Sequence, residues 1–124
     1  MDKKFDVLFY ENGKGERPIL QYIQELKRQQ GNKDARIKFQ KITEYIRKLE
    51  IFGTSVGMPE VDKIESEDNL YELRPLKDRI FFCYWKDNTF LLLHHFVKKT
   101  QKTPKREIKQ AKRNLKDWLE RYGD

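Results

Sequence analysis

The amino-acid sequence predicts an α+β fold in which helices pack against one small antiparallel sheet. Two consecutive helical patterns occupy the first half of the chain, and three β-type segments follow closely on one another after residue 70. The links between these segments are two or three residues long, which allows antiparallel hairpins and excludes crossover helices. A last helical pattern follows, so the expected order is β-α-α-β-β-β-α.

The first half of the chain predicts a strand and a pair of helices. The apolar run of residues 5–10 is followed by Asn12-Gly13 and reads as a strand that ends in a turn. Pro18 opens the first helix, whose apolar stripe is Ile19, Tyr22, Ile23 and Leu26. Asn32 is the expected N-cap of the second helix, whose apolar stripe is Ala35, Phe39, Ile42, Ile46 and Leu49. The short link predicts an antiparallel helical hairpin.

The second half predicts three strands and one helix. Residues 53–59 are expected to form a loop, and the acidic segment 60–69 has no assignable pattern. Strands are expected over residues 70–75, 79–86 and 89–97. Thr103 predicts an N-cap, with Pro104 in the first position of the last helix. The apolar stripe of that helix is Ile108, Ala111, Leu115, Trp118, Leu119 and Tyr122.

Composition excludes several classes of protein. The 124 residues are 37% hydrophobic, 38% charged and 13% aromatic, which fits one domain over residues 1–124 and argues against a disordered chain. The longest apolar run, residues 90–93, is far short of the roughly 20 residues of a membrane span. No apolar stretch follows the N-terminal lysines, as a secretory signal would require. The one cysteine, Cys83, is expected in the core. We therefore expect a cytoplasmic protein without membrane contact.

The positive charge is concentrated at the C-terminal end. The formal net charge is +7, and residues 98–124 contain ten basic and four acidic side chains. A concentrated basic segment is typical of polyanion binders, and nucleic acid is favoured over a membrane because the segment is not strongly apolar. A solvated helix face that only keeps the protein soluble would show the same pattern.

The residues that can carry chemistry are cations, two histidines and one carboxylate. Motifs of serine hydrolases and of phosphate-binding loops are absent from the sequence. Arg74 and Arg79 flank a tight link and would form one anion-binding patch if both turn to the open face of the sheet. Cations stabilise the charge on a phosphorane, and His or Glu moves protons. Because RNA supplies its own 2′-hydroxyl nucleophile, no metal and no cofactor are expected.

Strand periodicity predicts which side chains of the last strand share a face. Successive side chains point to opposite faces. One face is expected to carry Leu92, His94, Phe96 and Lys98, and the other Leu93, His95, Val97 and Lys99. Each face would thus end in one histidine and one lysine.

Three stretches of the second half carry a resemblance to a known family. They are Tyr71–Arg74, Arg79–Tyr84 and Leu92–Pro104, with Glu107, Ile108 and Ala111 following. In this spacing, residues 70–115 closely resemble the HigB-type toxins of the RelE/ParE superfamily. The resemblance implies a RelE-like fold and a toxin of a type II toxin–antitoxin pair. Its relatives cleave mRNA in the ribosomal A site and are neutralised by a HigA-type helix-turn-helix antitoxin.

The resemblance also assigns roles to residues. Arg74 and Arg79 match the phosphate-binding arginines, and Lys99 or Lys98 matches the basic residue that closes the last strand. His94 matches a histidine that is a candidate general acid or base, and Glu72 is a further candidate base. The remaining RNA-binding candidates are Lys98, Lys102, His95 and Lys105, of which His95 is an alternative proton donor.

Less specific interpretations stand beside these roles. Arg74 could have no role beyond an ion pair with Glu72 or Asp78. His94 could be a hydrogen-bonded core residue, and the lysines could serve only as anchors for ribosomal RNA. Two other functions also remain open. One is a ParE-like toxin that binds DNA gyrase, and the other is a non-catalytic nucleic-acid-binding module. The partners expected for the leading hypothesis are the ribosome, mRNA and the antitoxin, with the toxin–antitoxin complex assembled through an antitoxin dimer.

Overall fold

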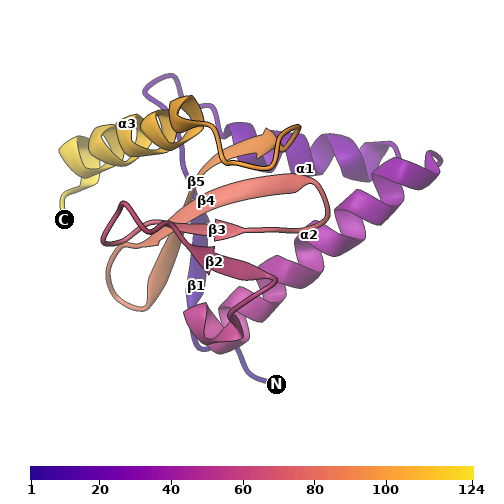
Figure 1. The fold of residues 1–124 in the computed structure, drawn as a ribbon, viewed down its shortest axis with the longest axis horizontal. Helices are drawn as coiled ribbons and strands as arrows, with labels where there is room; N and C mark the ends of the chain where they lie inside the picture. The colour runs from indigo at the N-terminus through magenta and orange to yellow at the C-terminus, as the bar shows by residue number, and fades with distance from the viewer.

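The computed structural model describes residues 1–124 and contains three α-helices, a short 3-10 helix and a five-stranded sheet (Figure 1). The helices are α1 (Pro18–Arg28), α2 (Lys33–Phe52), η1 (Gly53–Val56) and α3 (Lys105–Tyr122). The strands are β1 (Asp6–Phe9), β2 (Val61–Lys63), β3 (Tyr71–Leu73), β4 (Asp78–Tyr84) and β5 (Thr89–Val97). The predicted α+β class is confirmed, and the arrangement is consistent with a RelE-like fold. None of the helices has the length and hydropathy needed to cross a membrane.

The strand order in the sheet is β1-β5-β4-β3-β2. Neighbours from β2 to β5 pair antiparallel, as the short links predict, but β1 pairs parallel to β5. The expectation of a wholly antiparallel sheet is therefore wrong at this edge. A parallel neighbour requires a long connection, and α1 and α2 lie within the one that joins β1 to the rest of the sheet. The segment 60–69, which showed no pattern, contributes the edge strand β2, which is too short for its periodicity to be recognised.

Each face of the sheet carries its own hydrophobic core. On one face α1 and α2 bury Ile42 and Leu49 against Phe82 and Leu92, and on the other face α3 buries Trp118 with other apolar residues of the sheet. The predicted helix stripes are confirmed, except that Tyr122 is exposed. Cys83 is buried as expected, and burial raises the pKa of its thiol to about 12. This thiol therefore stays protonated at neutral pH and is a packing group.

A β-bulge in β5 changes the predicted faces of that strand. Phe81 of β4 pairs with His94, but the next residue, Phe82, pairs with Leu92, so Leu93 is the extra residue. Leu92 therefore packs on the α1–α2 side, whereas Leu93 and the ring of His94 both face the α3 side. The prediction that Leu92 and His94 share a face is wrong, because strict alternation of side chains fails at a bulge.

The predicted starts of α1 at Pro18 and of α2 at the Asn32 cap are confirmed, and that of α3 is wrong in its cap. The Asn32 side chain accepts a hydrogen bond from the Ala35 backbone N–H at 3.0 Å, so the predicted N-cap of α2 is confirmed. Thr103 does not cap α3, since Pro104 occupies the N-cap position. The hydroxyl of Thr103 instead donates to Glu72 Oε2 at 3.1 Å, across the face of the sheet.

The α1–α2 core supplies one prediction on stability. Ile42 is 0% exposed, so Ile42→Ala is expected to lower the free energy of unfolding by about 2–5 kcal/mol, through lost burial and the cavity left behind. Ile37 lies on the same helix but is 36% exposed, and Ile37→Ala is the matched control with a change within about 0.5 kcal/mol. Urea denaturation of both variants measures the difference. Equal losses would contradict the assignment of Ile42 to the core.

Candidate functional site

One buried carboxylate and two arginines form an ion-pair cluster on the α3 face of the sheet. Glu72 of β3 is only 3% exposed. Its Oε1 atom lies 3.6 Å from Nε of Arg74 and 3.5 Å from Nε of Arg79. We call Glu72, Arg74 and Arg79 the arginine cluster. Both arginines contact one carboxylate oxygen, so the predicted juxtaposition of Arg74 and Arg79 is confirmed, and the alternative pairing of Arg74 with Glu72 is present as well.

Strand pairing explains why these residues meet. Glu72 lies opposite Phe81, and Arg79 lies opposite Phe96. Phe81 and Phe96 both belong to the core beneath α3. Directly paired residues project from the same face of a sheet, so Glu72 and Arg79 also lie on the α3 side. The sequence could indicate this face only conditionally, because it depends on the register of β3 and β4.

Arg79 is held by backbone carbonyl groups. Its Nη1 donates to the carbonyl oxygens of Leu76 at 2.7 Å and of Asp78 at 2.9 Å. Leu76 has a positive φ of 57°, a conformation that an L-residue adopts only when its surroundings enforce it. Burial lowers the pKa of Arg79, and the neighbouring Glu72 carboxylate opposes this effect. Nη2 has no hydrogen-bond partner within the protein, and Nε is buried without one.

A basic depression lies next to the arginine cluster. We use this name for the hollow lined by Lys77, Arg79, Val97, Lys98, Lys99, Thr100 and Gln101. The backbone N–H of Lys98 donates to the carbonyl of Lys77 at 2.8 Å, which joins the end of β5 to the β3–β4 turn. The structure thus brings together three predicted site residues, Arg79, Lys98 and Lys99, in a hollow without an acidic side chain. Such a hollow suits an anion of the size of a phosphate.

His94 lies on the same face as the arginine cluster but is separated from it by Phe81. Phe81 pairs with Glu72 on one side and with His94 on the other, which places Glu72 and His94 two strand spacings apart, about 10 Å. His94 Nε2 lies 2.8 Å from Oε1 of Glu107 on α3. The ring is half-buried and lines a groove with Tyr10, Gln110 and Asn114. His94 is therefore hydrogen-bonded, as the less specific interpretation expected, while one side of it stays open to a ligand.

His95 points to the opposite face of the sheet. It pairs with Ile80, a residue of the α1–α2 core, and its Nε2 lies 2.7 Å from Oδ1 of Asp78. Tyr22 of α1 donates its hydroxyl to the same Oδ1 at 2.8 Å. We call Tyr22, Asp78 and His95 the Asp78 cluster. The structure does not bring His95 to the arginine cluster, because the sheet lies between them.

Lys102 and Lys105 are exposed, line no part of the basic depression and form no ion pair with the arginine cluster. Lys105 is the first residue of α3, and neither lysine side chain has an ion pair within the protein. The carbonyl of Lys102 accepts a hydrogen bond from Thr100, at 2.8 Å, which shapes the loop between β5 and α3. Both lysines flank the basic depression along the chain and extend its positive charge.

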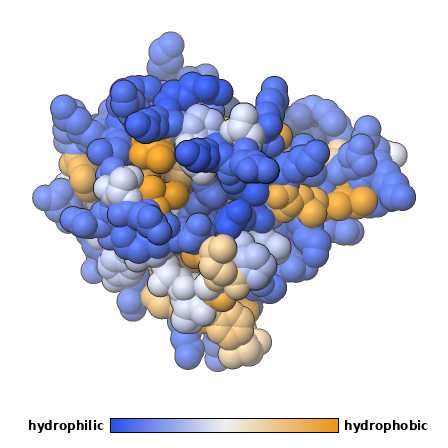
Figure 2. Space-filling view, viewed as in Figure 1, coloured by the Kyte–Doolittle hydropathy of each residue, from blue (hydrophilic) through white to orange (hydrophobic).

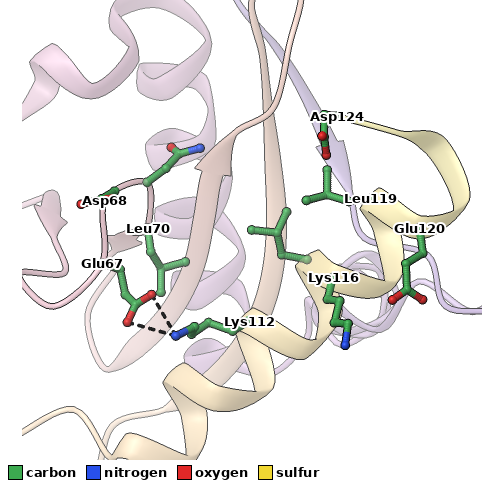
Figure 3. Close-up of a pocket in the computed structure, with 10 residues that line it drawn as sticks. Glu67, Asp68, Leu70, Lys112, Lys116, Leu119, Glu120 and Asp124 are labelled. Atoms are coloured by element: carbon green, nitrogen blue, oxygen red, sulfur yellow. Dashed lines mark hydrogen bonds and ion pairs between the residues drawn. The ribbon is translucent and has the colours of Figure 1, made fainter.

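A second hollow lies between the β2–β3 loop and α3 and has a different character (Figure 3). Leu70, Leu115 and Leu119 contribute its apolar surface. Its charged lining residues are Glu67, Asp68, Lys112, Lys116, Glu120 and Asp124. Glu67 already pairs with Lys112 at 3.2 Å, as Figure 3 shows. With four carboxylates around it, this hollow disfavours a polyanion, and the basic depression is the better anion site.

The Asp78 cluster predicts a dependence of stability on pH. Burial alone would raise the pKa of Asp78, but the hydrogen bonds from His95 and Tyr22 outweigh it and hold the pKa below its ordinary 3.8. A depressed pKa contributes stability that is complete above the unfolded value and is lost as pH falls through the folded value. We therefore expect the difference in unfolding free energy between wild type and Asp78→Asn to shrink as pH falls below ~4. Urea denaturation across this range measures it, and a difference that grows on acidification would contradict the sign.

Sequence reasoning missed three residues at or near the site. Thr103 was assigned to a helix cap and instead binds Glu72, 31 residues away along the chain. Asp78 and Tyr22 are 56 residues apart, and no local pattern links them. The sequence offers Asp78 only as an ion-pair partner of Arg74, a pairing that the structure does not show.

Comparison with known proteins places the chain in a family. A search of the curated proteins finds no match. Residues 34–116 match the model of the family described as Phage derived protein Gp49-like (DUF891). This segment runs from the start of α2 to the last turns of α3 and contains the whole arginine cluster and basic depression. Because it spans more than half of the sequence, the chain belongs to the Gp49-like family, a phage-derived family of toxin-like proteins.

Proposed function

We propose that this protein is the toxin of a type II toxin–antitoxin pair and acts as a ribosome-dependent mRNA endoribonuclease of the HigB type. The observation that carries the proposal is the basic depression beside the arginine cluster, a hollow that Arg79, Lys98 and Lys99 line together. Membership of the toxin-like Gp49 family supports the same conclusion. The protein would act in the cytoplasm, without a metal or cofactor, and a HigA-type helix-turn-helix antitoxin would neutralise it.

The chemistry follows from the groups around the depression. Attack of the RNA 2′-oxygen on the adjacent phosphorus forms a 2′,3′-cyclic phosphate and breaks the bond to the 5′-oxygen. A base takes the 2′-hydroxyl proton and an acid returns a proton to the leaving oxygen, so no external reactant is needed. Arg79 and the lysines stabilise the negative charge on the phosphorane. His94 and Glu72 are the available proton-transfer groups on this face.

The two candidates differ in their surroundings, and His94, which exchanges protons in this proposal, lines a groove separate from the basic depression. Glu72 is buried, contacts both arginines and accepts from Thr103, so its main task is to orient the guanidinium groups. His94 borders an open groove and has one ring nitrogen next to Glu107. A carboxylate on one nitrogen of an imidazole orients the ring and supports proton transfer at the other.

The first test is induced expression in cells, followed by primer extension on a reporter mRNA. Wild type is expected to arrest growth and to cut within translated codons, and the Arg74→Ala/Arg79→Ala pair is expected to do neither. Growth arrest without cuts would favour a gyrase-binding toxin of the ParE type, and binding to RNA without arrest or cuts would favour a non-catalytic nucleic-acid-binding module. Either result would overturn the proposed endoribonuclease activity.

A further inference from the structure

The Asp78 cluster fixes three elements at one point behind the basic depression. Asp78 is fully buried, and its Oδ1 atom accepts from both Tyr22 and His95. The two rings stack with centroids 4.0 Å apart. Because a carboxylate only accepts, the ring nitrogen of His95 that faces it carries the proton. The cluster thereby ties α1 to the first residue of β4 and to the last third of β5 (Figure 1).

The residue at the centre of this cluster also holds Arg79. The backbone carbonyl of Asp78 accepts from Arg79 Nη1, and the backbone N–H of Asp78 donates to the carbonyl of Pro75 at 3.0 Å, closing the turn that presents the Leu76 carbonyl. Both acceptors of Arg79 Nη1 therefore belong to a turn whose end is anchored by the Asp78 side chain.

The same carboxylate also anchors the strand that carries Lys98. His95 lies on β5, three residues before Lys98, which directly follows the strand. The Lys98 backbone N–H donates to the carbonyl of Lys77 in the turn. Of the two chain segments that enter the basic depression, the β3–β4 turn ends at Asp78, and the end of β5 is bonded to Asp78 Oδ1 through His95. None of the three residues of the Asp78 cluster lines the depression itself.

The buried Asp78 carboxylate is better explained by the orientation it gives to neighbouring residues than by a gain in stability. Burying a carboxylate costs free energy that hydrogen bonds only partly offset, and an apolar side chain of similar size often stabilises a core as well or better. The second oxygen of Asp78 is buried without a hydrogen-bond partner, which adds to this cost. Unlike an apolar contact, a fixed carboxylate holds the groups that donate hydrogen bonds to it in a defined orientation.

We propose that Tyr22, Asp78 and His95 are positioning residues that hold Arg79 and Lys98 in the arrangement that binds the scissile phosphate. His95 thus acts on Arg79 and Lys98 through Asp78, since it lines the groove of His94 and not the basic depression. The identification of the phosphate as that of mRNA rests on the proposed function, whereas the effect on Arg79 follows from the contacts of this chain alone.

Two tyrosine variants test this inference. Tyr22→Phe removes one hydrogen bond to Asp78 and keeps the ring that stacks on His95. Tyr84→Phe is the control, because the Tyr84 hydroxyl also makes one hydrogen bond, accepting from the Asn88 backbone N–H at 3.0 Å, but lies at the far end of β4 and lines neither the basic depression nor the groove of His94. Both variants are expected to remain folded.

Two readouts separate positioning from a merely structural role. The first is solvent exchange of the Arg79 guanidinium protons by NMR, which is expected to accelerate about 10-fold in Tyr22→Phe and to stay unchanged in Tyr84→Phe. The second is cleavage on programmed ribosomes well below both melting temperatures, where Tyr22→Phe is expected to lower kcat about 10-fold or more with little change in KM, because a small displacement of a catalytic contact costs rate. His95→Gln, which keeps a donor, is expected to retain more activity than His95→Ala.

Failure of the positioning role and failure of the proposed function give different results. Unchanged Arg79 exchange in Tyr22→Phe, or equal kcat values for the two tyrosine variants, would overturn the positioning role. If wild type does not cleave mRNA at all, the proposed function fails, and the NMR exchange alone decides whether the Asp78 cluster positions Arg79.

Discussion

Arg79→Ala is expected to lower the rate of mRNA cleavage about 10²–10³-fold, which is typical for the loss of one donor to a charged transition state. Arg79 lines the basic depression and its Nη1 is held by two backbone carbonyls, so the guanidinium is oriented before substrate binds. Arg74→Ala is expected to reduce the rate less, since Arg74 borders the same carboxylate but does not line the depression. Single-turnover cleavage on programmed ribosomes measures both effects.

Arg47→Ala is the control for the loss of a positive charge. Arg47 lies on α2, where it pairs with Glu50 and donates to the backbone of Met1, away from the depression. Its removal is expected to leave the cleavage rate within about 2-fold of wild type, as surface substitutions usually have small effects. A loss in Arg47→Ala equal to that in Arg79→Ala would mean that overall charge, and not the oriented guanidinium, controls the rate.

Glu72→Ala is expected to lower the free energy of unfolding by about 3–5 kcal/mol, the cost of removing one partner of a buried ion pair. The substitution leaves Arg79 buried beside a second arginine without a compensating charge. It also removes the acceptor for Thr103, which attaches the loop before α3 to the sheet. Urea denaturation at neutral pH measures the loss.

The matched control for this loss is Glu60→Ala. Glu60 pairs with Lys48 at 2.9 Å, and both side chains are partly open to solvent. Exposed pairs contribute about 0–1 kcal/mol, so the control is expected to lose much less than Glu72→Ala. Similar losses in the two variants would show that the arginine cluster is screened by solvent and is not a buried network.

The sequence predicted the elements that depend on local pattern. The stripes of α1 and α2 and the Asn32 cap were confirmed because helical periodicity and capping act within a few residues. β1 was predicted as a strand, but its parallel pairing with β5 is a property of the whole sheet. β2 was not predicted, since a three-residue strand at an edge shows no periodicity.

The sequence indicates which residues form the candidate site, but only part of how they lie relative to one another. Arg79, Lys98 and Lys99 do meet in one hollow, and Arg74 and Arg79 do share a face. The bulge at Leu93 places Leu92 and His94 on opposite faces, and no residue in the apolar run marks its position. The roles of Thr103 and Asp78 depend on partners 31 and 56 residues distant, which only the folded chain brings together.

The formal net charge of +7 fits the polyanion partner of the proposed function. Figure 2 shows a mainly hydrophilic face interrupted by small hydrophobic patches. Positive charge on such a surface accelerates encounter with RNA and makes binding sensitive to salt. This electrostatic contribution gives affinity, whereas the oriented groups of the arginine cluster and basic depression would provide the chemistry.

The most direct test of the account is cleavage by the purified protein in a reconstituted system, with and without ribosomes. An mRNA positioned on the ribosome is expected to be cut in the A-site codon, leaving a 2′,3′-cyclic phosphate, and the same free RNA is expected to stay intact because the ribosome supplies the orientation. Absence of any cut on the programmed ribosome, with protein that is folded and arrests growth in cells, would contradict the proposed endoribonuclease.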